Sequence, residues 1–444
     1  MNRKHFNRLL KTLRTALHEL KRQREVKVLS HCDADGIAAS AILINVLRNL
    51  NIDYSVEFLK SSGEVDLKKY SEFVVATDLN IDPNLNSIVF DHHYTLNQGV
   101  INPFNFGFSG SEEISASGLL GLFSYLQSRE NSRFFSLSIL GAIGDRQDRN
   151  GKLIGLNRWF LKKGCERGVV QEEKDIRLYG KETKKIANLL CYSSDPFIPG
   201  MTGNIKSCFS FLSSIGIRNK RWSELTLHEK RRLITKLVYL MFKSNVPVDT
   251  TKNLIGYVYT FPNEPKGSEL RDAKEFSTLL NATARTDHPE VGLSVCLGDR
   301  EKDLLFARKL LDLYRTQIID GLNYIRKKDP IVHGNLQYFY ARDKIKDTMI
   351  GTILGIAVSS GILPDDRVNL GLANTDNSKI KVSARISPQM NINLASALYS
   401  AAKLVGGSGG GHNVAAGAII PKGEEENFIY NLESIITSNL FSKS

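Results

Sequence analysis

The sequence predicts an α/β protein whose parallel-sheet N-terminal domain carries a helical insertion, followed by a smaller C-terminal α/β domain. Between residues 26 and 145, short apolar runs alternate with helical stretches, which implies a parallel sheet covered on both faces. Residues 150–325 are lysine-rich and mostly helical in pattern, and strand–helix alternation resumes near residue 330. A chain of 444 residues is long enough for two or three domains. We expect them at 1–185, 186–325 and 326–444.

The apolar pattern places the elements of the first domain. Phe6, Leu9, Leu10, Leu13, Leu17 and Leu20 recur at helical spacing near the N-terminus. The segment lacks the continuous apolar run of a secretory signal, so an amphipathic helix packed on the first domain is favoured over a targeting peptide. Strands are predicted at 26–30, 54–59, 73–77 and 88–90. Helices are predicted at 36–50, 116–126 and 134–143.

The remaining elements follow the same reasoning. In the middle region the clearest helical periods cover 233–242 and 302–325. In the last region strands are predicted at 336–341, 368–373, 379–386 and 414–420, and helices at 349–359 and 394–404. A glycine-rich segment, 406–411, lies between the last predicted helix and the last predicted strand.

Charge and cysteine content restrict the class of protein. The formal net charge is +12, which favours polyanionic partners, although a generally lysine-rich surface is an equally good reading of charge alone. The five cysteines are scattered and form no C-x-x-C pair, which argues against a disulfide framework or a zinc knot and fits a reducing cytoplasm. No uninterrupted apolar run approaches the roughly 20 residues that span a bilayer. We therefore expect a soluble cytoplasmic protein without membrane contact.

Acidic and imidazole side chains gather at the ends of the predicted elements of the first domain. Each alone has an ordinary explanation, since an aspartate after a strand is often a cap or turn residue. Four such groups at consecutive element ends are hard to attribute to caps, because the carboxyl ends of parallel strands share one sheet edge. The groups are His31, Asp33 and Asp35; Asp78; Asp91, His92 and His93; and Asp145.

A divalent-metal site explains this concentration better than stability does. Two unpaired carboxylates ~4 Å apart repel by about 4 kcal/mol at an effective dielectric constant near 20, so a cation is needed to hold them together. Aspartates and imidazoles without thiolate clusters suit Mn²⁺ or Mg²⁺ better than structural zinc. Several aspartates can bridge two ions, and such pairs support in-line phosphoryl displacement without a serine or cysteine nucleophile.

A second candidate site follows the last predicted helix. The glycine-rich turn ends in His412, and successive backbone N–H groups in such a turn can bind an anion. The alternative is a flexible linker; the flanking helix and strand favour anion binding. Arg385, at the end of a predicted strand, is a further phosphate-binding candidate, and Arg285 is a weaker one; a plain surface arginine explains either nearly as well.

These motifs, in this order, resemble the DHH phosphoesterases. The matching runs are His-x-Asp-x-Asp-Gly at 31–36, an isolated Asp78, Asp-His-His at 91–93 and Gly-Asp at 144–145. Gly-Gly-Gly-His at 409–412, followed by Ala-Ala-Gly at 415–417, is similar to the companion DHHA1-type domain of that family. The resemblance implies a DHH domain and a DHHA1-type domain facing each other across a cleft.

Within this family, Ser-Ala-Arg at 383–385 and Asn-Ala-x-x-Arg at 281–285 are most similar to archaeal RecJ-like nucleases of the GINS-associated type. That resemblance implies an exonuclease that trims single-stranded DNA or RNA with two divalent cations, Mn²⁺ in preference to Mg²⁺, in DNA replication or repair. It also implies association with GINS or other components of the replicative helicase.

The resemblance implies a role for each candidate residue. Asp91 would orient a ligand imidazole, and Arg285, Arg385, Gly409, Gly410, Gly411 and His412 would hold the substrate phosphate. The implied metal ligands and catalytic residues are Asp33, Asp35, Asp78, His92, His93 and Asp145, with His31 as an additional ligand.

Two other functions stay open. A phosphodiesterase of the same family could cleave very short oligonucleotides or cyclic dinucleotides. Such an enzyme would need no basic channel, and the helical middle region of the chain argues against it. A scaffold subunit of the replication fork could instead bind GINS and keep only secondary nuclease activity.

Overall fold

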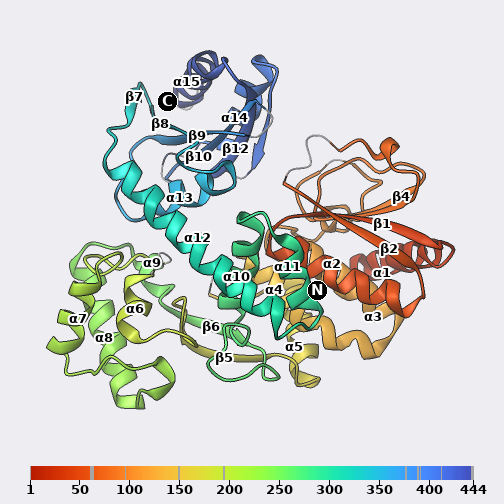
Figure 1. Cartoon of the computed structure of the whole chain (residues 1–444), viewed down its shortest axis with the longest axis horizontal. Helices are drawn as coiled ribbons and strands as arrows, with labels where there is room; N and C mark the ends of the chain where they lie inside the picture. Colours follow the sequence, from red (N-terminus) through yellow and green to blue (C-terminus); the bar gives the residue numbers. More distant parts are fainter. Residues whose placement is uncertain are drawn as a thin grey trace. The chain divides into compact units, whose positions relative to one another are not determined.

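The computed structural model describes residues 2–60, 65–95, 97–148, 151–193, 196–375, 378–387, 390, 392–411 and 413–441. The chain divides into two compact units, Met1–Leu311 and Asp312–Ser444, and the division falls within helix α12 (Lys302–Arg326) (Figure 1). The predicted α/β class is confirmed, with the parallel sheet in the N-terminal unit. The three domain ranges expected from the sequence stay a prediction.

The sheet of the first unit has four parallel strands in the order β2-β1-β3-β4. β3 and β4 are buried along their whole length because both faces are covered, which explains their continuous apolar sequence. All four predicted strands are confirmed, with ends shifted by at most one residue. Their bounds are β1 (Glu25–His31), β2 (Asp53–Leu59), β3 (Phe73–Thr77) and β4 (Ser87–Phe90).

Helices cover one face of this sheet. Helix α2 packs on β1 and β3, α3 packs on β4 through the rings of Phe123 and Phe90, and α4 packs against both helices. The other face is covered by an apolar cluster that includes Leu67, Ile81 and Val100 from connecting segments. The helices are α2 (Ala34–Asn49), α3 (Ala116–Gln127) and α4 (Phe135–Gly144), close to their predicted ranges.

The N-terminal segment is the amphipathic helix that its leucine spacing predicts. Helix α1 (Arg3–Leu20) buries Leu9, Leu13 and Leu17 and packs against α3 and the short 3₁₀ turn η2 (Pro103–Phe106). Its burial confirms an element docked on the first domain. Among the described residues, neither this helix nor any other is long and apolar enough to cross a membrane.

The middle of the chain is mainly helical, as predicted, and has its own apolar core around Trp222, Leu233 and Leu237. It also contains an antiparallel pair of strands, β5 (Gln171–Ile176) and β6 (Ile255–Thr260), which the sequence analysis missed because β5 is mostly charged. The helices are α5 (Gly155–Glu166), α6 (Ile186–Cys191), α7 (Ile205–Ser214), α8 (Leu227–Lys243), α9 (Val248–Lys252), α10 (Ala273–Arg285) and α11 (Pro289–Leu297).

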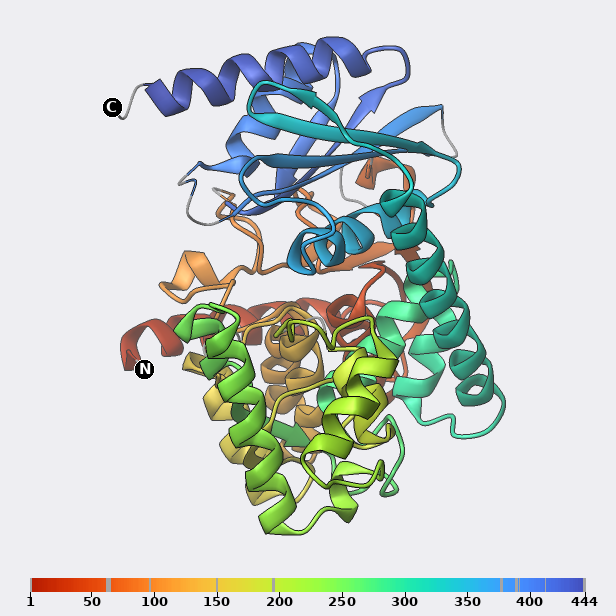
Figure 2. The ribbon, with the colours of Figure 1, turned by 90° about the vertical axis from the view of Figure 1, so that its left-hand side faces the viewer.

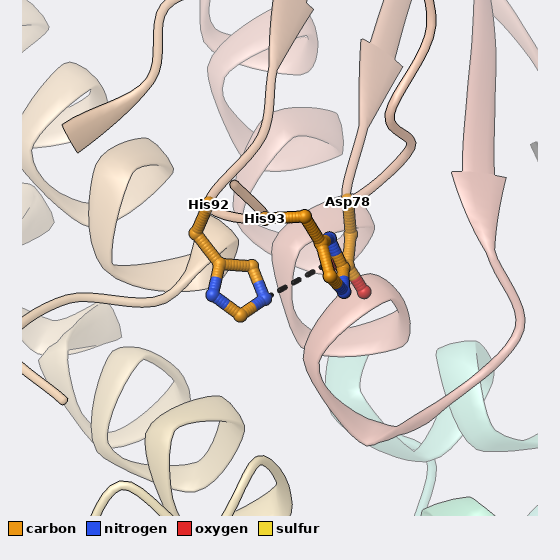
Figure 3. Close-up of side chains that lie close together, drawn as sticks. All are labelled: Asp78, His92 and His93. Atoms are coloured by element: carbon orange, nitrogen blue, oxygen red, sulfur yellow. Dashed lines mark ion pairs between the residues drawn. The ribbon is translucent and has the colours of Figure 1, made fainter. Parts of the chain in front are cut away.

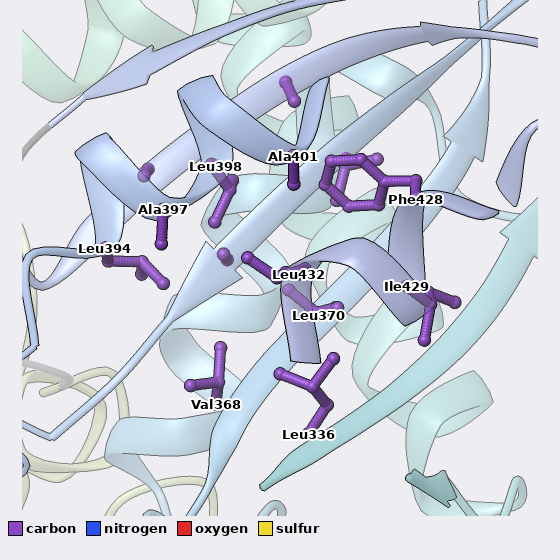
Figure 4. Packing of buried hydrophobic residues seen from close by; sticks show 14 of the residues in the cluster. Leu336, Val368, Leu370, Leu394, Ala397, Leu398, Ala401, Phe428, Ile429 and Leu432 are labelled. Atoms are coloured by element: carbon purple, nitrogen blue, oxygen red, sulfur yellow. The ribbon is translucent and has the colours of Figure 1, made fainter. Parts of the chain in front are cut away.

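The second unit contains a six-stranded sheet in the order β11-β12-β10-β9-β8-β7, in which only β8 and β9 pair in parallel. Helices α14 and α15 pack on one face through the core drawn in Figure 4. Helix α13 packs on β9 and β10 from the opposite face (Figure 2). The elements are β7 (Ile331–His333), β8 (Leu336–Arg342), α13 (Asp347–Ser359), β9 (Val368–Asn374), β10 (Lys379–Arg385), α14 (Leu394–Leu404), β11 (Ser408–Gly411), β12 (Ala415–Pro421) and α15 (Glu425–Phe441).

The predicted glycine-rich turn is wrong, because Gly409, Gly410 and Gly411 belong to strand β11. They pair with β12 at the edge of the sheet, with Gly410 opposite Gly417. Glycine is needed at 411, where φ is +138° and an added Cβ would lie 2.6 Å from the Ala416 Cα. Because β11 is an edge strand, it pairs with β12 along one side only. Its backbone N–H groups alternate in direction and do not form the anion-binding nest of successive donors that a glycine-rich turn would provide.

Helix α10 is tied to the segment after β5 by a buried carboxylate. Glu275 is fully buried and accepts hydrogen bonds from the Glu182 backbone N–H, at 2.7 Å, and from the Thr183 hydroxyl. Burial, together with the nearby Asp272 carboxylate, raises the pKa of Glu275 to about 7. The charged form is therefore disfavoured in the folded protein.

We predict that Glu275→Gln stabilises the protein much more at pH 8 than at pH 5. The folded pKa lies above the unfolded value of ~4.3, so the contribution of Glu275 is present at low pH and is lost as pH rises through about 7. The gain is on the order of 4 kcal/mol at pH 8 and about 1 kcal/mol at pH 5, because a shift of one pKa unit corresponds to about 1.4 kcal/mol. Urea unfolding of both proteins at the two pH values measures it, and an equal effect at both would contradict the assignment.

Candidate metal centre

Three of the four strands of the parallel sheet, β1, β3 and β4, end next to predicted ligands. His31 is the last residue of β1, Asp78 follows β3 directly, and His92 and His93 lie just past β4. Asp33 caps the N-terminus of α2, where its side chain accepts a hydrogen bond from the Gly36 N–H. Asp35 lies in the first turn of α2 and Asp145 follows the last residue of α4. All seven candidates are in the first unit.

These side chains form three overlapping groups, in each of which the potential ligand atoms lie within 4.8 Å of one another. Figure 3 shows the central group, in which His92 and His93 approach Asp78. Asp78 and His92 each belong to two groups, so the three groups form one continuous cluster. Their members are His31, Asp33 and Asp78; Asp78, His92 and His93; and Asp35, His92 and Asp145.

Asp78 is the centre of the cluster. One of its carboxylate oxygens lies 3.5 Å from the His31 Nδ1 and the other 3.3 Å from the His92 Nε2. Burial raises the pKa of Asp78, but the two imidazoles outweigh it and hold the pKa below its usual value. The residue has a positive φ of 60°, a strained conformation for a non-glycine residue. Such strain at a polar, buried position is typical of functional sites.

The tautomer of His92 is set by the loop that follows it. The Nδ1–H donates to the Gly110 carbonyl at 2.6 Å, so in the neutral ring the Nε2 carries a lone pair. That atom lies 3.1 Å from an Asp145 oxygen. Burial lowers the pKa of His92, but Asp145 and Asp78 outweigh it and raise the pKa well above its usual value. The Nε2 position therefore requires either a proton or a cation.

His93 is oriented by Asp91. The Asp91 carboxylate is fully buried and lies 2.9 Å from the His93 Nδ1, while it also accepts the His93 backbone N–H at 3.1 Å. The Asn102 amide, 3.4 Å away, contacts the same carboxylate. This arrangement fixes which ring nitrogen of His93 is available, as carboxylates behind ligand histidines do.

The side chain of Asp35 reaches from α2 to the N-terminus of α3. Its carboxylate accepts hydrogen bonds from the Ser115 hydroxyl at 2.7 Å, the Ala116 N–H at 2.7 Å and the Ser117 N–H at 3.1 Å. The helix dipole favours a negative charge there. Burial nevertheless raises the pKa of Asp35 well above its usual value, and Asp145 and Asp78 raise it further. In this arrangement its oxygen lies 4.0 Å from the His92 Nε2.

The donor set fits a divalent cation. Buried polar atoms in proteins nearly always have a hydrogen-bond partner, yet both oxygens of Asp78 and one oxygen of Asp145 face imidazole nitrogens that can donate to them only when the rings are protonated. Carboxylate oxygens and imidazole nitrogens without thiolates are ligands for Mn²⁺ and Mg²⁺. A cation would satisfy these atoms and offset the mutual repulsion of the carboxylates.

Helix α10, which comes late in the sequence of the first unit, also contacts the segment that carries Asp33 and Asp35. The Asn281 side chain accepts a hydrogen bond from the Ala34 N–H at 3.0 Å, next to Asp33 and Asp35. Arg285, the last residue of α10, lies close enough to act on Cys32. Burial raises the pKa of the Cys32 thiol, and His31 and Arg285 act in the opposite direction. Arg285 therefore acts electrostatically on Cys32, which lies between His31 and Asp33 in the sequence, and its role in phosphate binding stays a prediction.

The other candidates for phosphate binding belong to the second unit. The Arg385 guanidinium, on β10, donates to the carbonyls of Ala384 and Gly351, each at 2.8 Å. An added Cβ at Gly355 would lie 3.4 Å from the Arg385 Nε, so the guanidinium packs on the glycine face of α13. Gly409, Gly410 and Gly411 are in β11, and His412 lies outside the described residues.

Several residues that shape the site were missed by the sequence analysis. Ser115 has the sequence signature of a helix cap, which predicts a cap but not contact with Asp35. Asn102 and Asn281 act across the fold, and no local pattern marks them. Gln147 donates to the Gly110 carbonyl at 2.8 Å, the same atom that binds His92. Only tertiary structure reveals these partners.

Two family models match parts of the chain that follow the candidate metal centre in sequence. Residues 178–255 match the family model of the DHH-CID domain, and residues 335–438 match that of the DHHA1 domain. An uncharacterized protein of Methanocaldococcus jannaschii is 30% identical over 446 residues, which covers 94% of each chain.

Solved structures show the same fold at low sequence identity. RecJ from Thermus thermophilus in complex with Mn²⁺ has a TM-score of 0.58 at 16% identity, and covers 97% of this chain, which spans only 55% of that protein. A second exonuclease RecJ bound to manganese gives a TM-score of 0.56 at 18% identity, with 96% and 94% coverage. CDC45 from Entamoeba histolytica gives 0.62 at 10% identity, with 96% and 99% coverage. The chain therefore belongs to the DHH superfamily and has a RecJ-like fold.

Proposed function

We propose that the protein is a divalent-metal-dependent exonuclease that hydrolyses phosphodiester bonds of single-stranded DNA or RNA. The observation that carries the proposal is the continuous cluster of Asp and His ligand atoms centred on Asp78 and His92. Two further facts support it: the net charge of +12, which favours a polyanionic substrate, and the RecJ-like fold.

We assign the cluster to two cations, with Mn²⁺ preferred to Mg²⁺. One site would use His31, Asp33 and Asp78, and the other Asp35, His92 and Asp145, with His93 beside the shared Asp78. Bound cations would supply an activated water and neutralise charge on the phosphate. Asp91 holds the His93 ring, and the Gly110 carbonyl holds the His92 ring in the tautomer with Nε2 toward the cluster.

Phosphate binding is assigned to two arginines and the β11 segment. Arg285 lies at the end of α10, on the same unit as the metal cluster, and an arginine can grip a phosphate with two parallel hydrogen bonds. In the second unit Arg385, Gly409, Gly410, Gly411 and His412 stay candidates for the same role.

The two alternatives make different predictions. A phosphodiesterase for short oligonucleotides or cyclic dinucleotides would turn over a dinucleotide faster than a long oligomer. A scaffold subunit would bind a partner such as GINS and show little nuclease activity; the similarity to CDC45 is the observation that keeps this candidate.

We predict that Mn²⁺ raises the melting temperature of the wild-type protein by several degrees, because a ligand that binds only the folded state stabilises it. At a concentration of ~100 Kd the gain is about 2.7 kcal/mol. Asp78→Asn should abolish the shift, since it removes the carboxylate shared by two ligand groups. Thermal unfolding with and without millimolar MnCl₂ measures it.

Asp82→Asn is the matched control, because Asp82 is an exposed carboxylate in the same segment after β3. Its shift with Mn²⁺ should equal that of the wild type. A wild-type protein without any shift, or an Asp78→Asn variant with a full shift, would contradict the assignment of the cluster to metal.

We predict that the protein with Mn²⁺ degrades single-stranded oligonucleotides progressively from one end. Asp145→Asn should lower the rate by about 100-fold or more, since Asp145 would contribute a charged oxygen to the second proposed metal site. DNA and RNA oligomers, each labelled at either terminus, show the direction and the preferred sugar in one experiment. Unchanged substrates with a Mn²⁺-bound protein would refute the nuclease and favour the scaffold.

We predict that Gly141→Ala weakens metal binding although it introduces a better helix former. An added Cβ inside α4 would lie 2.0 Å from the Asp35 Oδ1 and 2.1 Å from the Ser117 Oγ, so the Asp35 carboxylate has to move. Overpacking of this kind costs ~1–3 kcal/mol, more than the roughly 1 kcal/mol of helix propensity gained. Thermal unfolding with and without Mn²⁺ should show a lower melting temperature and a reduced shift.

Gly355→Ala in α13 is the control for this substitution. The nearest atom to its Cβ would be the Arg385 Nε at 3.4 Å, an ordinary contact, so stability should be retained or increased. A Gly141→Ala protein as stable and as responsive to Mn²⁺ as the wild type would show that Asp35 is not held by this close packing.

A further inference from the structure

An exposed aromatic ring directly follows the Asp-His-His run. Tyr94 is 71% exposed, whereas Asp91 and His92 are buried and His93 is partly buried. Consecutive Cα atoms are ~3.8 Å apart, so this ring begins one residue from a proposed metal ligand. Tyr239, Tyr399 and Tyr430 are exposed as well, but they belong to helices α8, α14 and α15.

The Tyr94 ring is supported from one side. The ring of Phe104, in η2, meets it at 72° with 5.7 Å between the ring centroids, an edge-to-face contact. Phe104 is itself partly buried and packs close to Gly110, where an added Cβ would lie 3.1 Å from its ring. Tyr94 is therefore held against a fixed neighbour although most of its surface is open to solvent.

One buried side chain connects this aromatic pair to the metal cluster. The fully buried Asn102 donates to the His93 carbonyl at 2.8 Å and to the Asp91 carboxylate at 3.4 Å. Its side-chain oxygen accepts the Phe104 N–H at 3.1 Å. Asn102 thus fixes the backbone next to Tyr94 and at Phe104, and it also contacts Asp91, the carboxylate that orients the His93 ring.

We propose that Tyr94 is a stacking platform for a nucleobase of the strand whose phosphate is held at the metal centre. The inference deepens the proposed function, on which it rests, by assigning a base contact. A phosphodiester of single-stranded nucleic acid carries bases that stack on aromatic side chains irrespective of sequence. A rigid ring beside the ligands positions the terminal nucleotide without reading its identity.

The test measures, in the presence of Mn²⁺, binding of a single-stranded oligonucleotide that carries 2-aminopurine at either terminus and has phosphorothioate linkages, which resist hydrolysis. Tyr94→Ala should weaken the Kd by about 5- to 150-fold, the range that corresponds to base–aromatic stacking, and reduce the quenching of the terminal probe. Tyr94→Phe keeps the ring and should behave as wild type. Tyr239→Ala, which removes an equally exposed tyrosine in the same unit, is the matched control.

A second oligonucleotide with an abasic terminal residue separates stacking from structure. The wild type should lose affinity for it by the factor that Tyr94→Ala loses on the normal oligonucleotide, and Tyr94→Ala should lose nothing further. The inference would be overturned if Tyr94→Ala lowered the affinity for the normal and the abasic oligonucleotide by the same factor, or if it lowered neither. A wild-type protein that does not bind the oligonucleotide would also overturn it. Binding with the expected pattern but no hydrolysis in Mn²⁺ would refute the proposed function and leave the base contact standing.

Discussion

The carboxylate of Asp78 is buried within ion-pair distance of three imidazoles, which can donate hydrogen bonds to its oxygens only when the rings are protonated. Carboxylates of Asp35 and Asp145 lie around the same His92 nitrogen. Without a cation, this arrangement depends on protons held by histidines, which the neighbouring carboxylates draw onto the rings. The folded structure therefore carries an electrostatic cost that a bound cation would relieve, and the surrounding hydrogen bonds hold these side chains in place against that cost.

The parallel sheet explains how residues so far apart in sequence meet. Three neighbouring strands, β1, β3 and β4, end at one edge of the sheet, and each places candidate ligands just where the strand ends. Helix ends complete the set, since α2 begins at Asp33 and α4 ends before Asp145. The N-terminus of α3 then holds Asp35 through Ser115 and two backbone N–H groups. The support of the ligands is thus as extensive as the ligand set itself.

Much of this could be predicted from sequence, because strand ends and acidic motifs are local signals. The apolar runs at β3 and β4 and the Asp-His-His run are readable without a structure. Asn102, Gly110 and Asn281 are not, since each acts through a tertiary contact that no spacing announces. Strand β5 was missed because its residues are charged, and β11 was taken for a turn because glycine carries no strand pattern. Residues 408–411 form a strand because they pair with β12, and such pairing cannot be read from the local sequence.

The central claim is that one cluster holds two cations, joined by Asp78 and His92. Anomalous X-ray diffraction at the manganese edge, from crystals of the protein soaked in MnCl₂, tests it most directly. We expect two adjacent anomalous peaks, one among His31, Asp33 and Asp78 and the other among Asp35, His92 and Asp145. A single peak, or peaks away from these side chains, would contradict it.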